Sequence, residues 1–156
     1  MSAEQRLREL NITLPVMSTP AANYANAVRT GNLLFISGKG PLAVNGKFPH
    51  GKLGQEFTVD EGYRLARSAA LDLIAVIRTE LGSLDHVARI VEVQGFVNST
   101  PQFEDHANVL NGCSDLLVEI FQQRGVHARS VIGACSLRNG LPVVLKAVVE
   151  FSQERS

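Results

Sequence analysis

The chain has 156 residues, 45% of them hydrophobic and 19% charged, a composition typical of a folded globular domain with an apolar core. Its 15 lysines and arginines equal its 15 aspartates and glutamates, and only 6% of residues are aromatic, so nucleic acid is not expected as a main partner. No apolar run reaches the roughly 18 residues that span a bilayer, the N-terminus is polar, and the two cysteines lack CxxC spacing, so we expect a cytoplasmic protein with free thiols and no membrane partner.

The first twenty residues predict little regular structure. Residues 2–10 indicate a short helical turn, and residues 11–20 an extended segment that Pro15 and Pro20 interrupt. We expect residues 1–19 to be an N-terminal extension of one domain that spans residues 1–156.

A β-hairpin is expected next. Strands over residues 24–28 and 33–37 flank a four-residue turn, and the second strand is a continuous apolar run. It runs into Ser37-Gly38, where glycine lets the backbone turn sharply or approach another group closely. Residues 45–54 are polar and glycine-rich, which predicts a surface loop.

Two long helices are expected, separated by a strand over residues 87–97. The first should begin after Thr58, which has capping-box spacing to a glutamate, and end before a glycine; its apolar stripe places Asp72 on the solvated side. For the second we expect Thr100 as N-cap, Pro101 at the first helical position and Gly125 at the end.

The last part of the chain predicts two apolar strands, residues 131–137 and 143–151, joined as a hairpin. Asn139-Gly140 is the dipeptide that a two-residue type I′ turn favours, because both residues adopt positive φ. Arg129 stands just before the first of these strands. Two strands, a helix, a strand, a helix and two strands indicate an α+β fold, a two-layer α/β sandwich in which two long helices pack on a mixed sheet.

Few side chains in this pattern carry obvious chemistry. The four histidines show no metal-ligand spacing, and Cys113, mid-helix, and Cys135, mid-strand, are expected to be packed thiols. Asn108 is expected either to be solvated or to turn inward. The strongest candidate is Arg129, a fixed cation whose planar fork suits a carboxylate or phosphate, unless it forms a surface salt bridge.

Three segments carry a family resemblance: PAANYANAVRTGNLLFISGKGPL, FEDHANVLNGCSDLLVEIF and HARSVIGACSLRNGLPVVLKAVVEF. Over about residues 20–151 the chain resembles the YjgF/RidA/UK114 family, also called L-PSP endoribonucleases, as a divergent subgroup. The resemblance implies a chorismate-mutase-like fold, a homotrimer with a barrel-like core, ligand clefts between subunits and no cofactor. It also implies hydrolysis of reactive enamines or imines to a 2-keto acid and ammonia, as by 2-iminobutanoate/2-iminopropanoate deaminases.

The resemblance also implies roles for individual residues. Arg129 matches the catalytic arginine that binds the substrate carboxylate, and Val131 stands where the family has a cysteine, a place at which a backbone group could serve. The other positions implied to line the substrate cleft are Tyr24, Ser37, Gly38 and Asn108.

One departure from the family concerns the last strand. Deaminating members carry Glu-x-Glu-Ala there, and the first glutamate positions or activates water; this chain has Val144 and Lys146 at the two positions. A general base contributes about 10²–10⁴-fold in rate. Two functions therefore stay open, an imine deaminase and a non-catalytic module that binds small carboxylates or regulates, with an endoribonuclease disfavoured by the charge balance. Lys146 is either a surface or interface lysine or a second cation of the cleft.

Overall fold

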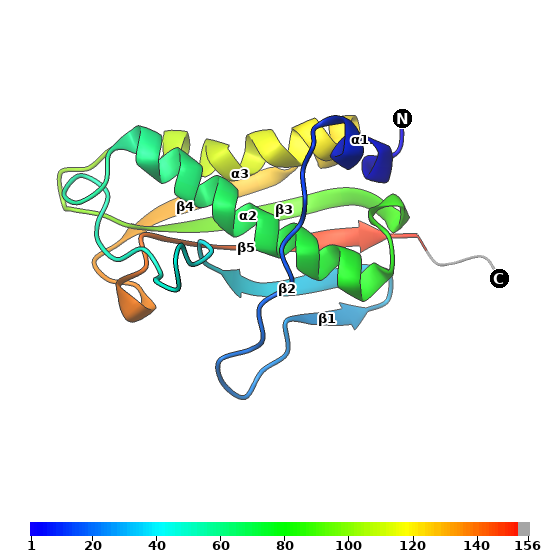
Figure 1. Cartoon of the computed structure of the whole chain (residues 1–156), viewed down its shortest axis with the longest axis horizontal. Helices are drawn as coiled ribbons and strands as arrows, with labels where there is room; N and C mark the ends of the chain where they lie inside the picture. Colours follow the sequence, from blue (N-terminus) through cyan, green and yellow to red (C-terminus); the bar gives the residue numbers. More distant parts are fainter. Residues whose placement is uncertain (153–156) are drawn as a thin grey trace.

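The computed structural model describes residues 1–152, which form a layer of helices on a β-sheet (Figure 1). The predicted α+β class and two-layer arrangement are confirmed. The elements in chain order are α1 (Ala3–Glu9), β1 (Ala27–Thr30), β2 (Leu33–Lys39), α2 (Val59–Leu81), η1 (Leu84–His86), β3 (Val87–Asn98), α3 (His106–Phe121), η2 (Gln122–Gly125), β4 (Ala128–Ala134), η3 (Arg138–Gly140) and β5 (Val143–Phe151), where η marks a 3₁₀ turn.

The sheet is mixed and has the strand order β1-β2-β5-β3-β4. Only β3 and β4 pair in parallel; the other neighbours are antiparallel, and β1 and β2 form the predicted hairpin. Helices α2 and α3 cover one face of the sheet, as Figure 1 shows. Strand β5, the last in the chain, therefore lies at the centre of the sheet.

The predicted hairpin between the last two strands is wrong. β3 lies between β4 and β5, so the segment that joins them crosses over β3 instead of closing a hairpin. Asn139 and Gly140 do adopt positive φ, 54° and 67°, as an Asn-Gly turn favours. Because a turn sets only the local backbone, it did not determine which strand β4 pairs with. β4 also begins earlier than expected, so Arg129 lies within it.

The first long helix has the predicted ends. Thr58 Oγ1 accepts from the backbone N–H of Glu61, Glu61 accepts from the N–H of Thr58, and Gly82 ends α2 with φ 82°. The second begins later than predicted, at His106, because residues 100–103 form a separate turn, closed by the N–H of Phe103 on the carbonyl of Thr100. It ends at Phe121, and η2 continues the turn to Gly125.

The core lies between the sheet and the two long helices, which approach each other closely at Gly112. A Cβ built on Gly112 would lie 1.9 Å from the carbonyl oxygen of Tyr63 on α2, so only glycine fits there. Side chains from both helices, β2, β3 and β5 fill the main apolar cluster, together with Ala3 and Leu7 of α1. Within residues 1–152, no helix is both long and apolar enough to span a bilayer.

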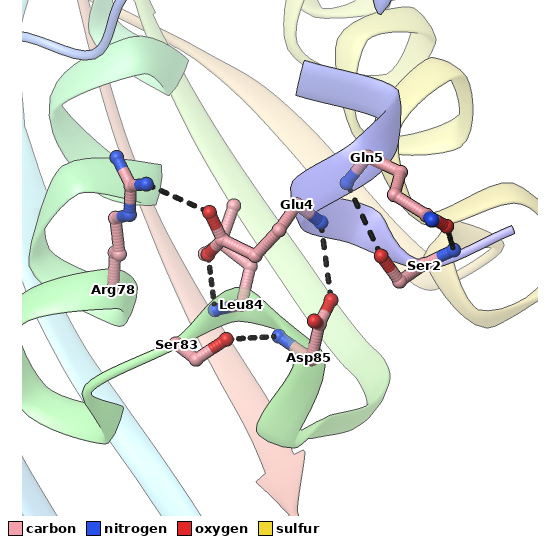
Figure 2. A network of polar contacts seen from close by, with 7 residues as sticks. All are labelled: Ser2, Glu4, Gln5, Arg78, Ser83, Leu84 and Asp85. Carbon is pink, nitrogen blue, oxygen red and sulfur yellow. Dashed lines mark hydrogen bonds and ion pairs between the residues drawn. The ribbon is translucent and has the colours of Figure 1, made fainter. Parts of the chain in front are cut away.

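Helix α1 is fixed to the body of the molecule by a polar network (Figure 2). The carboxylate of Glu4 pairs with Arg78 of α2 at 2.7 Å and accepts from the N–H of Leu84 at 2.8 Å. The N–H of Glu4 bonds to Asp85, and Ser2 caps the helix with Gln5. These contacts hold the start of the chain against the end of α2.

The face of the sheet away from the helices carries two apolar rows. Strand register aligns Val28, Phe35 and Val148 in one row and Val144, Phe96 and Ile132 in the other. Val28, Phe35 and Ile132 are exposed large hydrophobic residues. We call this surface the open face; exposed apolar patches of this kind mark interaction surfaces.

Candidate functional site

Arg129 lies on the edge strand β4 with its side chain toward α3. Its register partner on β3 is the buried Val93, so both side chains are on the helix side of the sheet. Arg129 Nη1 donates to Ser114 Oγ at 3.0 Å, and Nη2 donates to the carbonyl oxygen of Ala107 at 3.3 Å. The ion pairs formed among residues 1–152 do not include Arg129, so it has no salt bridge within that range.

Asn108 and Val131 are on the same edge of the molecule as Arg129. Asn108 follows the residue whose carbonyl Arg129 contacts; it is exposed, and its amide donates to Asp105 at 3.3 Å, which agrees with the solvated alternative. Val131 is two residues beyond Arg129 on β4 and packs half-buried against the core. We call these three residues the Arg129 half-site.

Tyr24 and Gly38 lie beside a different hollow, a cavity of about 320 Å³. Tyr24 is 45% exposed, and its hydroxyl accepts from the N–H of Ala21 at 3.3 Å. Ser37, next to Gly38, donates its hydroxyl to the carbonyl of Ala25 at 2.7 Å and so holds the loop that carries Tyr24. We call Tyr24, Ser37 and Gly38 the Tyr24 half-site.

The same cavity has charged residues that the sequence analysis did not identify as site residues. Lys39 is only 4% exposed and donates to Asn26 Oδ1 at 2.5 Å and to Ser18 Oγ at 3.2 Å. Burial lowers the pKa of the Lys39 amine, and the nearby Asp72 carboxylate opposes that shift. Arg138 also lines the cavity.

Asp72 is buried, so its predicted place on the solvated side of the helix is wrong. Its carboxylate accepts from the N–H of Ser18 at 3.1 Å and from the hydroxyl of Ser18 at 2.7 Å. The segment after α1 covers this part of α2 and gives the carboxylate its partners. The sequence did contain a signal of this burial, because Asp72 has an apolar residue on each side.

The two half-sites do not meet within one chain. Gly38 is on β2 and Arg129 on β4, and β5 and β3 lie between these strands. Strand spacing alone separates them by about 14 Å. Val144, where the resemblance places a glutamate, belongs to the Tyr24 side, because a Cβ built on Gly38 would lie 2.9 Å from its Cγ1.

The two cysteines have different surroundings. Cys113 is buried as predicted, and burial raises the pKa of its thiol to about 12, so it is not a nucleophile at neutral pH. Cys135 is exposed, because β4 ends at Ala134, and the prediction of a packed thiol is wrong there. It lines a second cavity, of about 560 Å³, with Lys52 and His106. In the part of the chain that the structure describes, no three His, Cys, Asp or Glu side chains gather as a metal site.

His127 and Ser114 are further residues at the Arg129 half-site that the sequence analysis missed. His127 Nε2 lies 2.9 Å from Ser114 Oγ, the atom that Arg129 also contacts. The only signal in the sequence is that His127 is two residues before Arg129; Ser114 is on a different element and has no local signal.

The chain is similar to a known protein family, to a protein of known sequence and to solved structures. Residues 4–147 match the family described as "YjgF/chorismate_mutase-like, putative endoribonuclease". Protein TCP17 of Trypanosoma cruzi is 40% identical over 147 residues, covering 94% of this chain and 92% of that protein. The protein Atu1372 of Agrobacterium tumefaciens, of unknown function, is 34% identical with a TM-score of 0.88, covering 96% of this chain and 92% of that one. TdcF of E. coli, solved with bound serine, is 18% identical with a TM-score of 0.64, covering 88% of this chain and 94% of that one, and it shares the fold.

Proposed function

The chain belongs to the YjgF/chorismate-mutase-like family, and from that premise we propose that it binds small 2-keto and 2-imino carboxylates in clefts between the subunits of a homotrimer. In this proposal Arg129 binds the carboxylate of the ligand. TdcF, which shares the fold, was solved with serine, a small molecule that also has a carboxylate.

The observation that carries the proposal is the uncompensated charge of Arg129. A guanidinium has five N–H donors in a planar fork. Two hydrogen bonds engage Arg129, one to a hydroxyl and one to a carbonyl, and none of the carboxylates in residues 1–152 pairs with it. The remaining donors and the full positive charge are free to bind a carboxylate in a bidentate manner.

An inter-subunit cleft explains why the predicted site residues form two groups. The Arg129 half-site and the Tyr24 half-site lie near opposite edges of one sheet. The open face offers an apolar surface through which subunits could associate. In a closed trimer the Arg129 half-site of one subunit would meet the Tyr24 half-site of its neighbour, as the family resemblance implies.

Titration calorimetry with 2-oxobutanoate tests the binding role. We expect micromolar-to-millimolar binding to the wild type and none to Arg129→Ala, because the loss of the guanidinium leaves the ligand carboxylate without its counter-charge. Arg129→Lys should weaken binding, since an ammonium lacks the planar fork. Arg89→Ala removes an exposed arginine from β3 and serves as the matched control. Equal binding by the wild type and Arg129→Ala, or no heat with the wild type, contradicts the proposal.

Ammonia release from enzymatically generated 2-aminoacrylate separates binding from turnover. Val144, beside the Tyr24 half-site, stands where the resemblance places a carboxylate in deaminating members, which favours a binding role. Faster release by the wild type than by Arg129→Ala would make the protein an imine hydrolase as well. Equal rates of ammonia release by the wild type and Arg129→Ala would mean that the protein binds carboxylates without hydrolysing imines.

A further inference from the structure

Three side chains meet around the hydroxyl of Ser114 on α3. His127 Nε2 lies 2.9 Å and Arg129 Nη1 lies 3.0 Å from Ser114 Oγ. The other ring nitrogen of His127, Nδ1, lies 2.6 Å from the carbonyl oxygen of Gly125. We call these contacts, which link Gly125 to Arg129, the Ser114 chain.

The hydrogen positions in the Ser114 chain follow from the groups at its two ends. A carbonyl oxygen only accepts, so Nδ1 of His127 must carry a hydrogen. In the neutral ring Nε2 then has the free lone pair and accepts the hydroxyl hydrogen of Ser114. A lone pair of Ser114 Oγ remains for Arg129, which only donates. Donation therefore runs in one direction, from Arg129 through Ser114 and His127 to Gly125.

We propose that Ser114 and His127 are positioning residues that hold the guanidinium of Arg129 in the orientation a ligand carboxylate requires. The inference rests on the proposed function and adds two residues to it. His127 directly precedes β4 and Arg129 is the second residue of that strand, and both side chains reach Ser114 Oγ. The carbonyl of Ala107 accepts from Nη2 of Arg129, so α3 holds the guanidinium through both terminal nitrogens.

This arrangement lowers the entropic cost of binding. An arginine side chain has many rotamers, and a ligand that must immobilise it loses affinity accordingly. In the Ser114 chain the guanidinium is held before the ligand arrives. The hydroxyl is itself held, because its hydrogen is committed to His127.

Calorimetry with 2-oxobutanoate on Ser114 and His127 variants tests the role of the chain. We expect Ser114→Ala to raise the Kd about tenfold, the loss typical of one hydrogen bond to a charged group. His127→Phe should raise it by a smaller factor, because Ser114 keeps its contact with Arg129 but loses its own partner. The double variant should bind no more weakly than Ser114→Ala, since both changes break the same chain.

Conservative variants, and a control at a second serine–histidine pair, distinguish loss of positioning from loss of folded structure. Ser114→Thr keeps the hydroxyl and His127→Gln keeps an acceptor near the place of Nε2, so both should restore most of the affinity. Ser99 and His106 form a second serine–histidine pair, 3.3 Å apart, beside Gly133 toward the other end of β4. Ser99→Ala should leave the Kd unchanged, and all variants should keep the thermal midpoint of the wild type within a few degrees.

The outcomes distinguish this inference from the function on which it rests. If Arg129→Ala loses binding while Ser114→Ala keeps the wild-type Kd, only the inference is contradicted. Additive effects of Ser114→Ala and His127→Phe contradict it as well. Equal binding by the wild type and Arg129→Ala contradicts the proposed function, and the Ser114 chain then has no binding role.

A spectroscopic measurement tests the chain without any ligand. Long-range ¹H–¹⁵N correlation spectra, recorded where the ring is neutral, should show the hydrogen of His127 on Nδ1. A hydrogen on Nε2 of the neutral ring would mean that Ser114 does not donate to His127, and it would overturn the proposed order of donors.

Discussion

At the scale of single residues, Gly38 and Val144 show how closely the Tyr24 half-site is packed. A Cβ built on Gly38 would lie 2.9 Å from Val144 Cγ1, which is closer than real Cβ atoms come to a neighbouring carbon. The β2–β5 register shifts between Ile36 and Lys39, the stretch that contains Gly38. A side chain at residue 38 therefore requires the neighbouring strand or its valine to move.

Gly38→Ala should destabilise the protein by about 1–3 kcal/mol, because the added methyl group overpacks this contact. Val144→Ala in the same chain should recover most of that loss, since it removes the methyl group that the new Cβ meets. Urea unfolding of the two single variants and the double variant measures the coupling. Wild-type stability of Gly38→Ala would show that the strands separate there at little cost.

The residue types of the candidate site could be recognised in the sequence, but their partners could not. Arg129 was the strongest candidate because its planar fork of donors suits a carboxylate or phosphate, and the family resemblance implied that it binds the substrate carboxylate. Its contact with Ser114 depends on where α3 lies over β4, which no local pattern specifies. Asp72 was misplaced for the same reason, because its partner Ser18 comes from a distant, irregular segment.

At the scale of elements, the Glu4 carboxylate adds two polar contacts to the apolar packing of Ala3 and Leu7 that attaches α1. The side chain of Glu4 is only 14% exposed, and it pairs with Arg78 and accepts from the N–H of Leu84 (Figure 2). Its removal leaves that N–H without its partner, in a partly buried place. An unsatisfied buried donor costs more than a lost surface contact.

Glu4→Ala should lower the free energy of unfolding by about 1–2 kcal/mol. Glu9→Ala is the matched control, because Glu9 is on the same helix and forms an exposed i,i+3 pair with Arg6 at 3.1 Å. That control should change stability by less than about 0.5 kcal/mol. Chemical denaturation followed by circular dichroism measures both, and equal effects would contradict the special role of Glu4.

Element boundaries were predictable where local signals set them. The capping box at Thr58 and the left-handed Gly82 define both ends of α2, and the apolar run of β5 gives its bounds. Pairing was not predictable, because the sheet order depends on contacts between segments far apart in the chain. The Asn139-Gly140 turn adopts its expected φ values and yet leads to a crossover over β3.

At the scale of the whole molecule, the open face predicts self-association. Phe35 is 44% and Ile132 is 50% exposed, on the sheet face opposite α2 and α3. Phe35→Glu places a charge in one of the two apolar rows. We expect analytical ultracentrifugation to show a trimer for the wild type and a folded monomer for this variant, with 2-oxobutanoate binding lost in the monomer.

Val16→Glu provides the control for that experiment. Val16 is 96% exposed in the segment after α1, so the same change of chemistry there should leave the oligomer and the binding intact. A monomeric wild type would contradict the inter-subunit cleft. The periodicity of the sequence was sufficient for the two-layer fold, but the separation of Tyr24 and Gly38 from Arg129 became visible only with the strand order.

The central place of β5 also bears on how the chain acquires its structure during synthesis. The strand that joins the β1–β2 hairpin to β3 is translated after the other four strands of this sheet. Until β5 leaves the ribosome, the edges of β2 and β3 lack the strand with which they pair. The two long helices then have only part of the sheet to cover. We therefore expect nascent chains that lack β5 to be clients of chaperones, and the decisive assembly event to follow translation of the final strand.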